Sequence, residues 1–363
     1  MKKIVVSVLA AVMALGLVAC GGSGGGTSGG GAAASTAASS TEAATGGEAS
    51  ANAEVTLGIG WTTASDPNDP YFVTTSTFKE EVEKASGGRI AVELYPSSQL
   101  GSEPEMWEGM QIGTCDMALM TNAYVSSFIP ANGTLDLPFV FENLDKARSV
   151  VDGEYGQKLI QNLNDTSGGV ICLTFSEGGF RQLCTRDKGV ATPADLNGMK
   201  IRCMETTTYL AAYKSLGVNA TPMAWGELLT ALQQGTVDGC DAPLSVLYTN
   251  GFPDICKYID NVNLFYSPLP ICISESVFNS LSAEDQQILR DAATAACKGA
   301  RASNDEKSKA MEEDLTSQGM TIITEDEVDS AAFQDAVQSA YDELESYVGS
   351  EWMSEIKSQV GLQ

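Results

Sequence analysis

The order of apolar and polar residues along 54–363 predicts alternating strands and helices. Residues 54–60 alternate between the two classes, which is typical of a strand. A helix is expected to begin at Pro70, because Asp69 supplies an N-cap, and to end at Gly87-Gly88. The elements expected next are a strand at 89–95, a helix at 103–112 and a strand at 116–120. This β-α-β-α-β order is typical of a mostly parallel sheet covered by helices.

The second half of the chain repeats this alternation and then becomes mainly helical. The elements expected there are strands at 169–175, 179–186, 199–204 and 236–240, a short helix at Thr192-Pro193-Ala194-Asp195, and helices at 207–216 and 225–234. A capping box at Ser282 opens a helical pattern that continues to about Gln318. Such a helix is roughly 50 Å long at 1.5 Å per residue. Two successive α/β halves and one long helix predict a two-lobed α/β protein with a ligand cleft between the lobes.

The N-terminal residues have the features of a lipoprotein signal peptide. Lys2 and Lys3 precede an apolar run from Ile4 to Val18, which is too short for a permanent membrane-spanning helix. The small residue before Cys20 completes a lipobox, so we expect residues 1–19 to be removed and Cys20 to be acylated. The protein would then be extracytoplasmic and held to the membrane through its lipid anchor only. The alternative is an ordinary cleaved signal peptide with an accidental cysteine.

A low-complexity segment follows the anchor and separates it from the rest of the chain. From Gly21 to Ala53 the residues are almost entirely Gly, Ser, Ala and Thr, and the only charges are Glu42 and Glu48. Such a segment buries too little apolar surface to fold, so residues 20–53 are expected to form a flexible linker. The linker either lets a folded receptor reach a membrane partner repeatedly or serves only as a spacer.

Composition excludes several classes of function. The formal net charge of −26 argues against nucleic-acid binding, which depends on neutralising phosphates, and against lying flat on anionic lipid. The chain has no histidine, which removes Ser-His-Asp and Cys-His catalysis and histidine-ligated zinc. No apolar stretch of about 20 residues occurs after the N-terminal run, so the body is not expected to cross a membrane. We expect no metal and no cofactor.

The cysteines leave the disulfide state open. Nine cysteines are present, and apart from the anchor they are scattered without any Cys-x-x-Cys pair. Several lie inside apolar runs, as Cys172 does, and this favours buried free thiols. An exported protein with these cysteines could also form disulfides, although the spacing names no pairing. A four-cysteine metal site is a further alternative.

Two separated stretches carry the motifs that bear on function. The first begins SSQLGSEPEMWEGMQIGTCDMALM at Ser97 and ends LDLPFVFENLDKA; the second contains GGFRQL, TPADLNGMKIR and LGVNATPMAWGELLTALQQGTVDGCDAP. In order and spacing these motifs closely resemble the solute receptors of TRAP transporters, of the DctP type, over about residues 54–350. The resemblance implies a two-lobed, periplasmic-binding-protein-like receptor that closes on an organic acid. It also implies delivery of that acid to a membrane permease that uses an ion gradient.

With this resemblance, the expected lobes are residues 54–178 with 268–305 (lobe I) and 179–267 with 306–363 (lobe II). The long helix would span both lobes, and the receptor is expected to be a monomer that meets the permease subunits. In such receptors the arginine of the KIR motif, here Arg202, forms a bidentate salt bridge with the ligand carboxylate. A guanidinium fork suits a carboxylate geometrically. The alternative for any single arginine is a surface or interlobe salt bridge.

The resemblance implies further ligand contacts. Arg181 of the GxR motif gives a second anionic or polar contact, and Trp225 stands where the family commonly has an aromatic wall, unless it is only a core tryptophan. Thr121 and Asn122 follow a strand at a cleft-facing position, where the alternative is simple capping. Further candidates flank the first strand–helix loop or lie in the DGCDAP stretch, and these are Trp61, Tyr71 and Asp241.

One departure from the family pattern bears on the ligand. The family often reads DGQENP where this chain has DGCDAP, so the asparagine that commonly contacts the ligand is Ala242 here. Together with a tryptophan in place of the usual phenylalanine, this leads to the hypothesis of a ligand with a flat or apolar portion beyond its carboxylate. A sialic-acid-like polyol is then less favoured.

Three other functions compete with this one. A substrate-binding lipoprotein of an ATP-driven importer shares the architecture and the anchor, and a surface sensor or adhesin can use the same fold. An enzyme such as a lipoprotein hydrolase is disfavoured, because no G-x-S-x-G elbow occurs and histidine is absent. We expect the protein not to be an enzyme.

Overall fold

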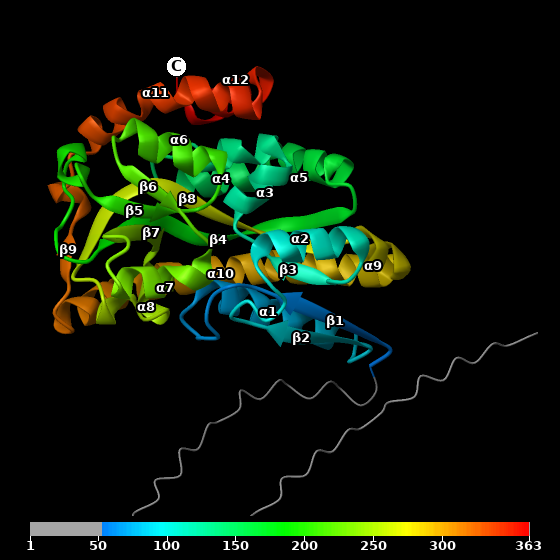
Figure 1. Ribbon diagram of the computed structural model, residues 1–363. Coiled ribbons are helices and arrows are strands. Elements are labelled where there is room, and N and C mark those ends of the chain that lie inside the picture. The colour runs from blue at the N-terminus through cyan, green and yellow to red at the C-terminus, as the bar shows by residue number, and fades with distance from the viewer. Residues whose placement is uncertain (1–52, 363) are drawn as a thin grey trace, which may run out of the picture. The chain divides into compact units, whose positions relative to one another are not determined.

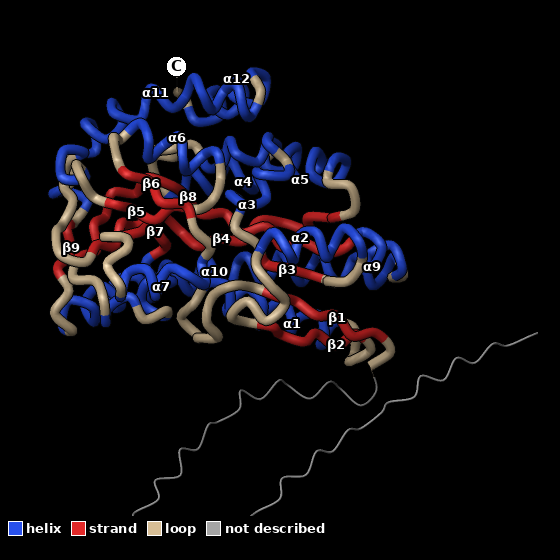
Figure 2. Tube along the Cα trace, viewed as in Figure 1, coloured by secondary structure: helices blue, strands red, loops and turns tan. Residues whose placement is uncertain are grey.

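The computed structural model describes residues 53–362, which belong to one compact unit (Figures 1 and 2). The expected signal peptide, Cys20 and almost all of the linker lie outside the described residues. No helix within residues 53–362 is long and apolar enough to cross a membrane.

The described residues contain one mixed sheet whose strand order is β2-β1-β3-β8-β4-β7-β5-β6, with β9 paired to β8. The strands are β1 Val55–Gly60, β2 Ile90–Tyr95, β3 Met117–Leu119, β4 Val170–Thr185, β5 Lys200–Cys203, β6 Asn219–Pro222, β7 Gly239–Pro243, β8 Tyr258–Ser274 and β9 Thr321–Ile323. β1 pairs in parallel with β2 and β3, and β5 pairs in parallel with β6 and β7. The expected βαβ units are therefore confirmed in both halves.

Helices cover both faces of the sheet. The α-helices are α1 Pro70–Ala85, α2 Glu103–Ile112, α3 Asn122–Phe128, α4 Leu144–Asp152, α5 Glu154–Thr166, α6 Thr207–Ser215, α7 Trp225–Gln233, α8 Leu244–Thr249, α9 Glu275–Ser280, α10 Ala283–Ser317, α11 Ser330–Val348 and α12 Ser350–Val360. Short 3-10 segments are η1 Pro130–Asp136, η2 Pro193–Leu196, η3 Phe252–Asp254 and η4 Glu325–Glu327. In Figure 1, α2 to α6 lie on one side of the strands, and α1, α7, α8 and α10 lie on the other. The apolar clusters of the core divide in the same way.

The long antiparallel pair β4 and β8 differs from the expectation. Two strands were predicted here, at 169–175 and 179–186, but β4 continues through Gly178 and Gly179 as one strand of 16 residues. Gly179 has a φ of +93°, and the register of β4 against β8 shifts between Glu177 and Gly179. The glycine allows a bulge, and the backbone bonds to β8 hold the strand together across it. Gly178-Gly179, which favours a turn in the sequence alone, therefore forms a bulge within one continuous strand.

The long helix is confirmed. α10 has 35 residues and begins after Ser282, whose hydroxyl accepts the Asp285 amide at 3.1 Å. It packs against α1, β4, α8 and β9. α10 thus contacts elements of both expected lobes.

The C-terminal helices pack on elements from both halves of the chain. Residues 306–363 were expected to belong to lobe II, and α11 does pack on α6 of that lobe. The last helix, α12, instead contacts α4 and η1, which fall in the expected lobe I. The chain therefore returns to the first half of the molecule at its end.

Candidate functional site

A cavity of about 130 Å³ lies where the ends of several strands meet. One part of its wall comes from the loop after β1, the first turns of α1 and α2, the end of β3 and α3. The other part comes from β4, β5, β7 and the first residues of α7 and α8. Ligands of α/β sheets bind beyond the carboxyl ends of the strands. Because both expected lobes contribute to its wall, this cavity is the candidate ligand site.

Five of the eight residues expected to bind ligand are on this wall, namely Tyr71, Thr121, Arg181, Arg202 and Trp225. They come from five different elements or their ends, so the fold gathers residues that are far apart in sequence. Ligand contact by each of them stays a prediction.

Arg202 is a buried cation that lacks an acidic partner. It lies on β5 and is only 1% exposed. Its Nε and Nη2 donate to the carbonyl oxygen of Met223 at 3.0 and 2.8 Å, and its guanidinium lies 6.0 Å from the ring centre of Trp225. Within residues 53–362 no carboxylate lies within 4.0 Å of it to form an ion pair. Since a guanidinium has five N–H donors and a buried charge is stable only when paired, Arg202 is suited to an anionic ligand.

Arg181 is held differently. Its Nε donates to a carboxylate oxygen of Asp241, and its Nη2 donates to the Asp241 carbonyl oxygen at 2.5 Å. Burial works to lower the pKa of the Arg181 guanidinium, but the Asp241 carboxylate outweighs it and holds this pKa above its usual range. Arg181 therefore reaches the cavity with its charge already balanced and can add a polar contact to a ligand.

Glu103 is a wall residue that sequence analysis missed. It is the first residue of α2 and is 3% exposed, and its two carboxylate oxygens accept the Thr121 amide at 3.1 Å and the Thr121 hydroxyl at 2.8 Å. The hydroxyls of Tyr71 and Thr121 are 2.9 Å apart. Burial raises the pKa of Glu103 to about 7, against the lowering effects of Thr121 and the nearby arginines. In the sequence this glutamate is indistinguishable from an ordinary acidic residue in the first turn of a helix.

One side of the cavity is apolar. Trp225 is half-buried at the start of α7, and its ring centre lies 5.6 Å from that of Phe252. Ala242 and Val246 line the same cavity from β7 and α8. The expectation that Ala242 removes a polar contact from this side is consistent with its place on the wall.

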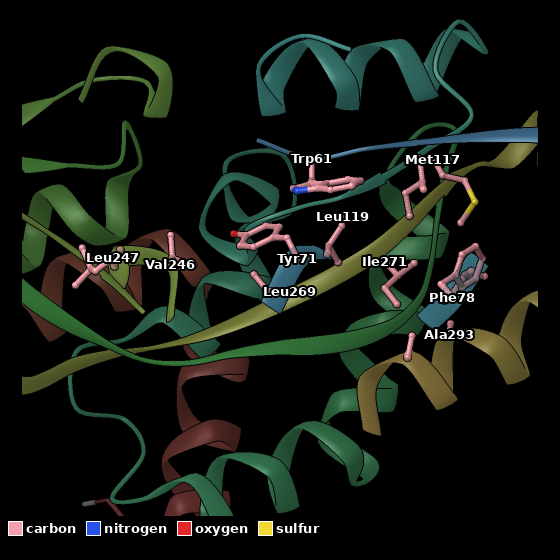
Figure 3. Packing of buried hydrophobic residues seen from close by; sticks show 14 of the residues in the cluster. Trp61, Tyr71, Phe78, Met117, Leu119, Val246, Leu247, Leu269, Ile271 and Ala293 are labelled. Atoms are coloured by element: carbon pink, nitrogen blue, oxygen red, sulfur yellow. The ribbon is translucent and has the colours of Figure 1, made fainter. Parts of the chain in front are cut away.

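Three expected ligand residues do not reach the wall. Asn122 is fully buried, and its Nδ2 donates to the Asn132 carbonyl at 2.9 Å and to Asp136 Oδ2 at 2.6 Å. Trp61 is also fully buried, and Figure 3 shows its ring among packed apolar side chains. Asp241 turns its carboxylate to Arg181. The residues that follow two of them, Thr62 and Ala242, are the ones that line the cavity.

The rest of residues 53–362 offers weaker candidates for a ligand site. A larger hollow of about 500 Å³ lies beside α11 and α12, but no arginine lines it, and Lys357 is the only cation on its described wall. The eight cysteines of residues 53–362 are all buried and free. Within the same residues no group of three or more His, Cys, Asp and Glu side chains could hold a metal ion.

Sequence and fold both match known proteins. The profile of the bacterial extracellular solute-binding proteins, family 7 (DctP), matches residues 62–347. A solute-binding protein of Verminephrobacter eiseniae (strain EF01-2) is 37% identical over 310 residues, which are 85% of this chain and 91% of that protein.

Two solved structures are similar as well. A TRAP periplasmic solute-binding protein of Bordetella bronchispeptica, with density assigned to pantoate, has a TM-score of 0.79 and 34% identity over 84% of this chain and 99% of that chain. A TRAP periplasmic solute-binding protein of Polaromonas sp. JS666, bound to D-erythronate, has a TM-score of 0.79 and 34% identity over 84% and 98%.

These matches separate the functions that the sequence left open. The matched proteins are solute-binding proteins and not enzymes, and the two solved ones are receptors of TRAP transporters. The expected two-lobed α/β fold is the fold of these receptors. The chain therefore belongs to family 7 of the bacterial extracellular solute-binding proteins, the DctP family, and is a solute receptor of a TRAP transporter.

Proposed function

We propose that this receptor binds a small hydroxylated organic acid through Arg202 and delivers it to an ion-gradient-driven TRAP permease. The observation that carries the proposal is the position of Arg202, a buried cation on the cavity wall that has no carboxylate partner among residues 53–362. A ligand carboxylate supplies the missing charge and can accept two N–H bonds from the guanidinium fork. The bound acids of the two similar structures, D-erythronate and pantoate, are hydroxylated monocarboxylates of this kind.

The other wall residues take separate roles in this proposal. Arg181 adds N–H donors next to the carboxylate, and the hydroxyls of Thr121 and Tyr71 face the hydroxyl groups of the ligand. Trp225 and Ala242 cover its less polar side. The proposed ligand therefore still has an apolar portion beyond its carboxylate. This portion is aliphatic, and the same acid also carries hydroxyl groups.

We propose that the receptor closes about a hinge at Gly179. Gly179 pairs with Ser267 across β4 and β8, at the bulge where the expected lobe boundaries at 178/179 and 267/268 meet. A bulge beside a glycine is a place where two strands can bend. Ligand held between Arg202 on one side and Thr121 on the other favours the closed form, because only that form makes both sets of contacts.

The cellular setting is part of the same proposal. Acylation at Cys20 with a linker to residue 53 would hold a monomeric receptor at the outer side of the membrane, near the permease subunits. The family is extracellular, which fits this placement. The test of the anchor is metabolic labelling with a palmitate analogue, which should label the native chain and leave Cys20→Ser unlabelled.

A thermal-shift panel tests the proposed ligand class. The panel contains D-erythronate, pantoate, galactonate, succinate and benzoate, applied to the native protein, to Arg202→Ala and to Arg290→Ala. Arg290 is a matched control because it lies on α10 over the ring of Phe278 and not on the cavity wall. A ligand at a hundred times its Kd stabilises the native protein by about 2.7 kcal/mol.

The expected result is stabilisation by hydroxylated monocarboxylates in the native protein and in Arg290→Ala, and none in Arg202→Ala. Loss of the buried charge pair should cost about 2–5 kcal/mol of binding free energy. Equal stabilisation of Arg202→Ala would refute the role of Arg202. Stabilisation by benzoate alone would refute the ligand class.

A further inference from the structure

The charges around the cavity do not balance once an anionic ligand is added. Arg181 is already paired with Asp241, so its charge is used within the protein. Arg202 is the remaining buried guanidinium on the described wall, and Glu103 is a buried carboxyl group on the same wall. A ligand carboxylate at Arg202 therefore adds an acidic group to a small cavity that already has the buried Glu103 and the exposed Glu205 on its wall and offers one unpaired cation among the described residues.

Glu103 has no cation of its own in the described residues. Both of its oxygens accept hydrogen bonds from Thr121, and no lysine or arginine lies within 4.0 Å of them. Other charged or titratable groups either act on the Glu103 carboxyl group or line the cavity beside it. Taken over all the elements packed around Glu103, these groups are Tyr71, Tyr124, Arg181, Arg202, Glu205 and Cys272. Among these, the two arginines are the groups that favour the ionised form.

Ligand binding removes part of that support. In the empty site the charge of Arg202 helps to keep Glu103 ionised, while burial raises the Glu103 pKa to about 7. A carboxylate bound to Arg202 cancels this charge and adds a like charge beside Glu103. Two carboxyl groups that share one small site do not both stay ionised, and the buried one with weaker charge support takes the proton.

We propose that Glu103 takes up one proton from solvent as the ligand carboxylate pairs with Arg202, so that the receptor binds its organic acid together with a proton. The inference rests on the proposed function, because it needs an anion at Arg202. The step is a simple protonation, in which the Glu103 carboxylate becomes a carboxylic acid and no bond in the ligand changes. The protonated group gains an O–H that can donate to an oxygen of the ligand.

The consequence is a pH-dependent affinity of a particular form. Above about pH 7 the empty site has Glu103 ionised, so each bound anion carries a proton and the affinity falls about tenfold per pH unit. Below about pH 6 the empty site is already protonated, so the affinity is flat until the ligand itself is protonated.

Calorimetric titration of the full chain with D-erythronate measures the proton directly. The titration is run in phosphate and in Tris, whose ionisation enthalpies differ, so that the difference in binding enthalpy gives the number of protons taken up. Nearly one proton per ligand is expected at about pH 8 and nearly none at about pH 6. Binding at about pH 8 without proton uptake overturns the inference and leaves the proposed function standing. The absence of binding by D-erythronate, pantoate and galactonate at both pH values overturns the proposed function and the inference together.

Two variants assign the proton. Glu103→Gln should bind without proton uptake and with an affinity that no longer depends on pH. Glu105→Gln is the matched control, because Glu105 lies in the same turn of α2, is exposed, and accepts from Ser102 instead of facing the cavity. It should keep the uptake of the native chain. Uptake that persists in Glu103→Gln overturns the assignment to Glu103 and points to another buried acid such as Asp136. Where Glu103→Gln fails to fold, the native titration still decides whether a proton is taken up with the ligand.

Discussion

Asp241 accepts a hydrogen bond from Arg181 Nε on its carboxylate and another from Arg181 Nη2 on its backbone carbonyl, the latter at 2.5 Å. This double contact makes Asp241 a positioning residue for Arg181, and Asp241 is not among the residues that line the cavity. Because Arg181 is paired in this way, Arg202 is the buried guanidinium of the described cavity wall that remains available to an anion. The two arginines of the site therefore have unequal tasks, although both are buried and both were expected to face the ligand.

The first prediction concerns the Arg181–Asp241 pair. Asp241→Asn leaves the Arg181 charge buried and unbalanced, so the free energy of unfolding should fall by about 3–5 kcal/mol. Urea denaturation monitored by tryptophan fluorescence measures this loss. Asp187→Asn removes an exposed partner of Lys257, and because solvent screens such a pair it should leave the free energy of unfolding nearly unchanged. Equal stability of the two variants would contradict the structural role of Asp241.

The second prediction concerns the shape of the Arg202 side chain. Arg202→Lys keeps the charge but loses the planar fork, so the affinity for the best acid should fall about 10- to 100-fold. The fall should appear in the dissociation constant from calorimetry, and Arg290→Lys should bind as the native protein does. Native-like affinity in Arg202→Lys would show that a point charge suffices and that the bidentate contact is absent.

The third prediction concerns ligand choice. Ala242→Asn places an amide on the apolar side of the cavity, at the position where the resembling family often has asparagine. The ratio of affinities should move towards galactonate and away from pantoate by about tenfold, the worth of one hydrogen bond. Ala242→Val adds bulk without polarity and should weaken both acids. A galactonate-to-pantoate ratio that stays unchanged in Ala242→Asn would remove Ala242 as a determinant of specificity.

The fourth prediction concerns pH and stability. Burial raises the pKa of Asp69 to about 6, of Asp260 to about 7 and of Asp136 to about 8. Because each folded-state value lies above the unfolded value of about 4, the folded chain binds more protons in this window. The contribution of each group is fully present below about pH 4 and is lost, by about 1.4 kcal/mol per pH unit, until the pH passes the folded pKa of that group.

Urea midpoints across this range measure the slope. Asp136→Asn imitates the protonated carboxyl group. It should therefore reduce the slope of stability against pH by the contribution of one carboxyl group. Asp187→Asn should not change the slope, because hydrogen bonding and charge attraction from Lys257 lower the Asp187 pKa and place its effect at more acidic pH. Stability that rises with pH between about pH 4 and pH 8 would contradict this account.

The sequence was sufficient for the architecture where local signals agreed with the packing. Asp69 caps α1, accepting the Tyr71 amide at 2.9 Å, and Gly113 ends α2 in the left-handed conformation, as expected. The length of α10 follows from one uninterrupted helical pattern. The continuous strand β4 was harder to predict from the sequence. Gly178-Gly179 favours a turn when its neighbours in sequence are considered alone, and it forms a bulge because β8 pairs with β4 on both sides of it.

The site was predictable in part for a similar reason. Motif resemblance identified Arg202 and Arg181, but it could not show that Asp241 neutralises one of them. Glu103 was missed because an acidic residue at the start of a helix is common, and its hydrogen bond with Thr121, the N-cap residue of α3, is visible only in the fold. The side chain of Asn122 turns inward to Asp136 and does not line the cavity, which the sequence alone could not show.

The fifth prediction addresses the cysteines, whose pairing the sequence left open. Burial raises the pKa of Cys115 and Cys297 to about 11 and that of Cys203 to about 12, so the native thiols should react slowly with Ellman's reagent. After unfolding without reductant, eight thiols should react in a chain that begins after Cys20. A lower count would mean disulfides, and Cys172, which faces Cys272 across β4 and β8, would be the first partner to examine.

The most direct measurement is a crystal structure of the receptor with the acid that stabilises it most. The account predicts that the ligand carboxylate lies against the Arg202 guanidinium with two N–H···O contacts of about 2.7–2.9 Å, and that Asp241 remains on Arg181. A carboxylate bound elsewhere in the cavity, with Arg202 still bonded only to Met223, would contradict it.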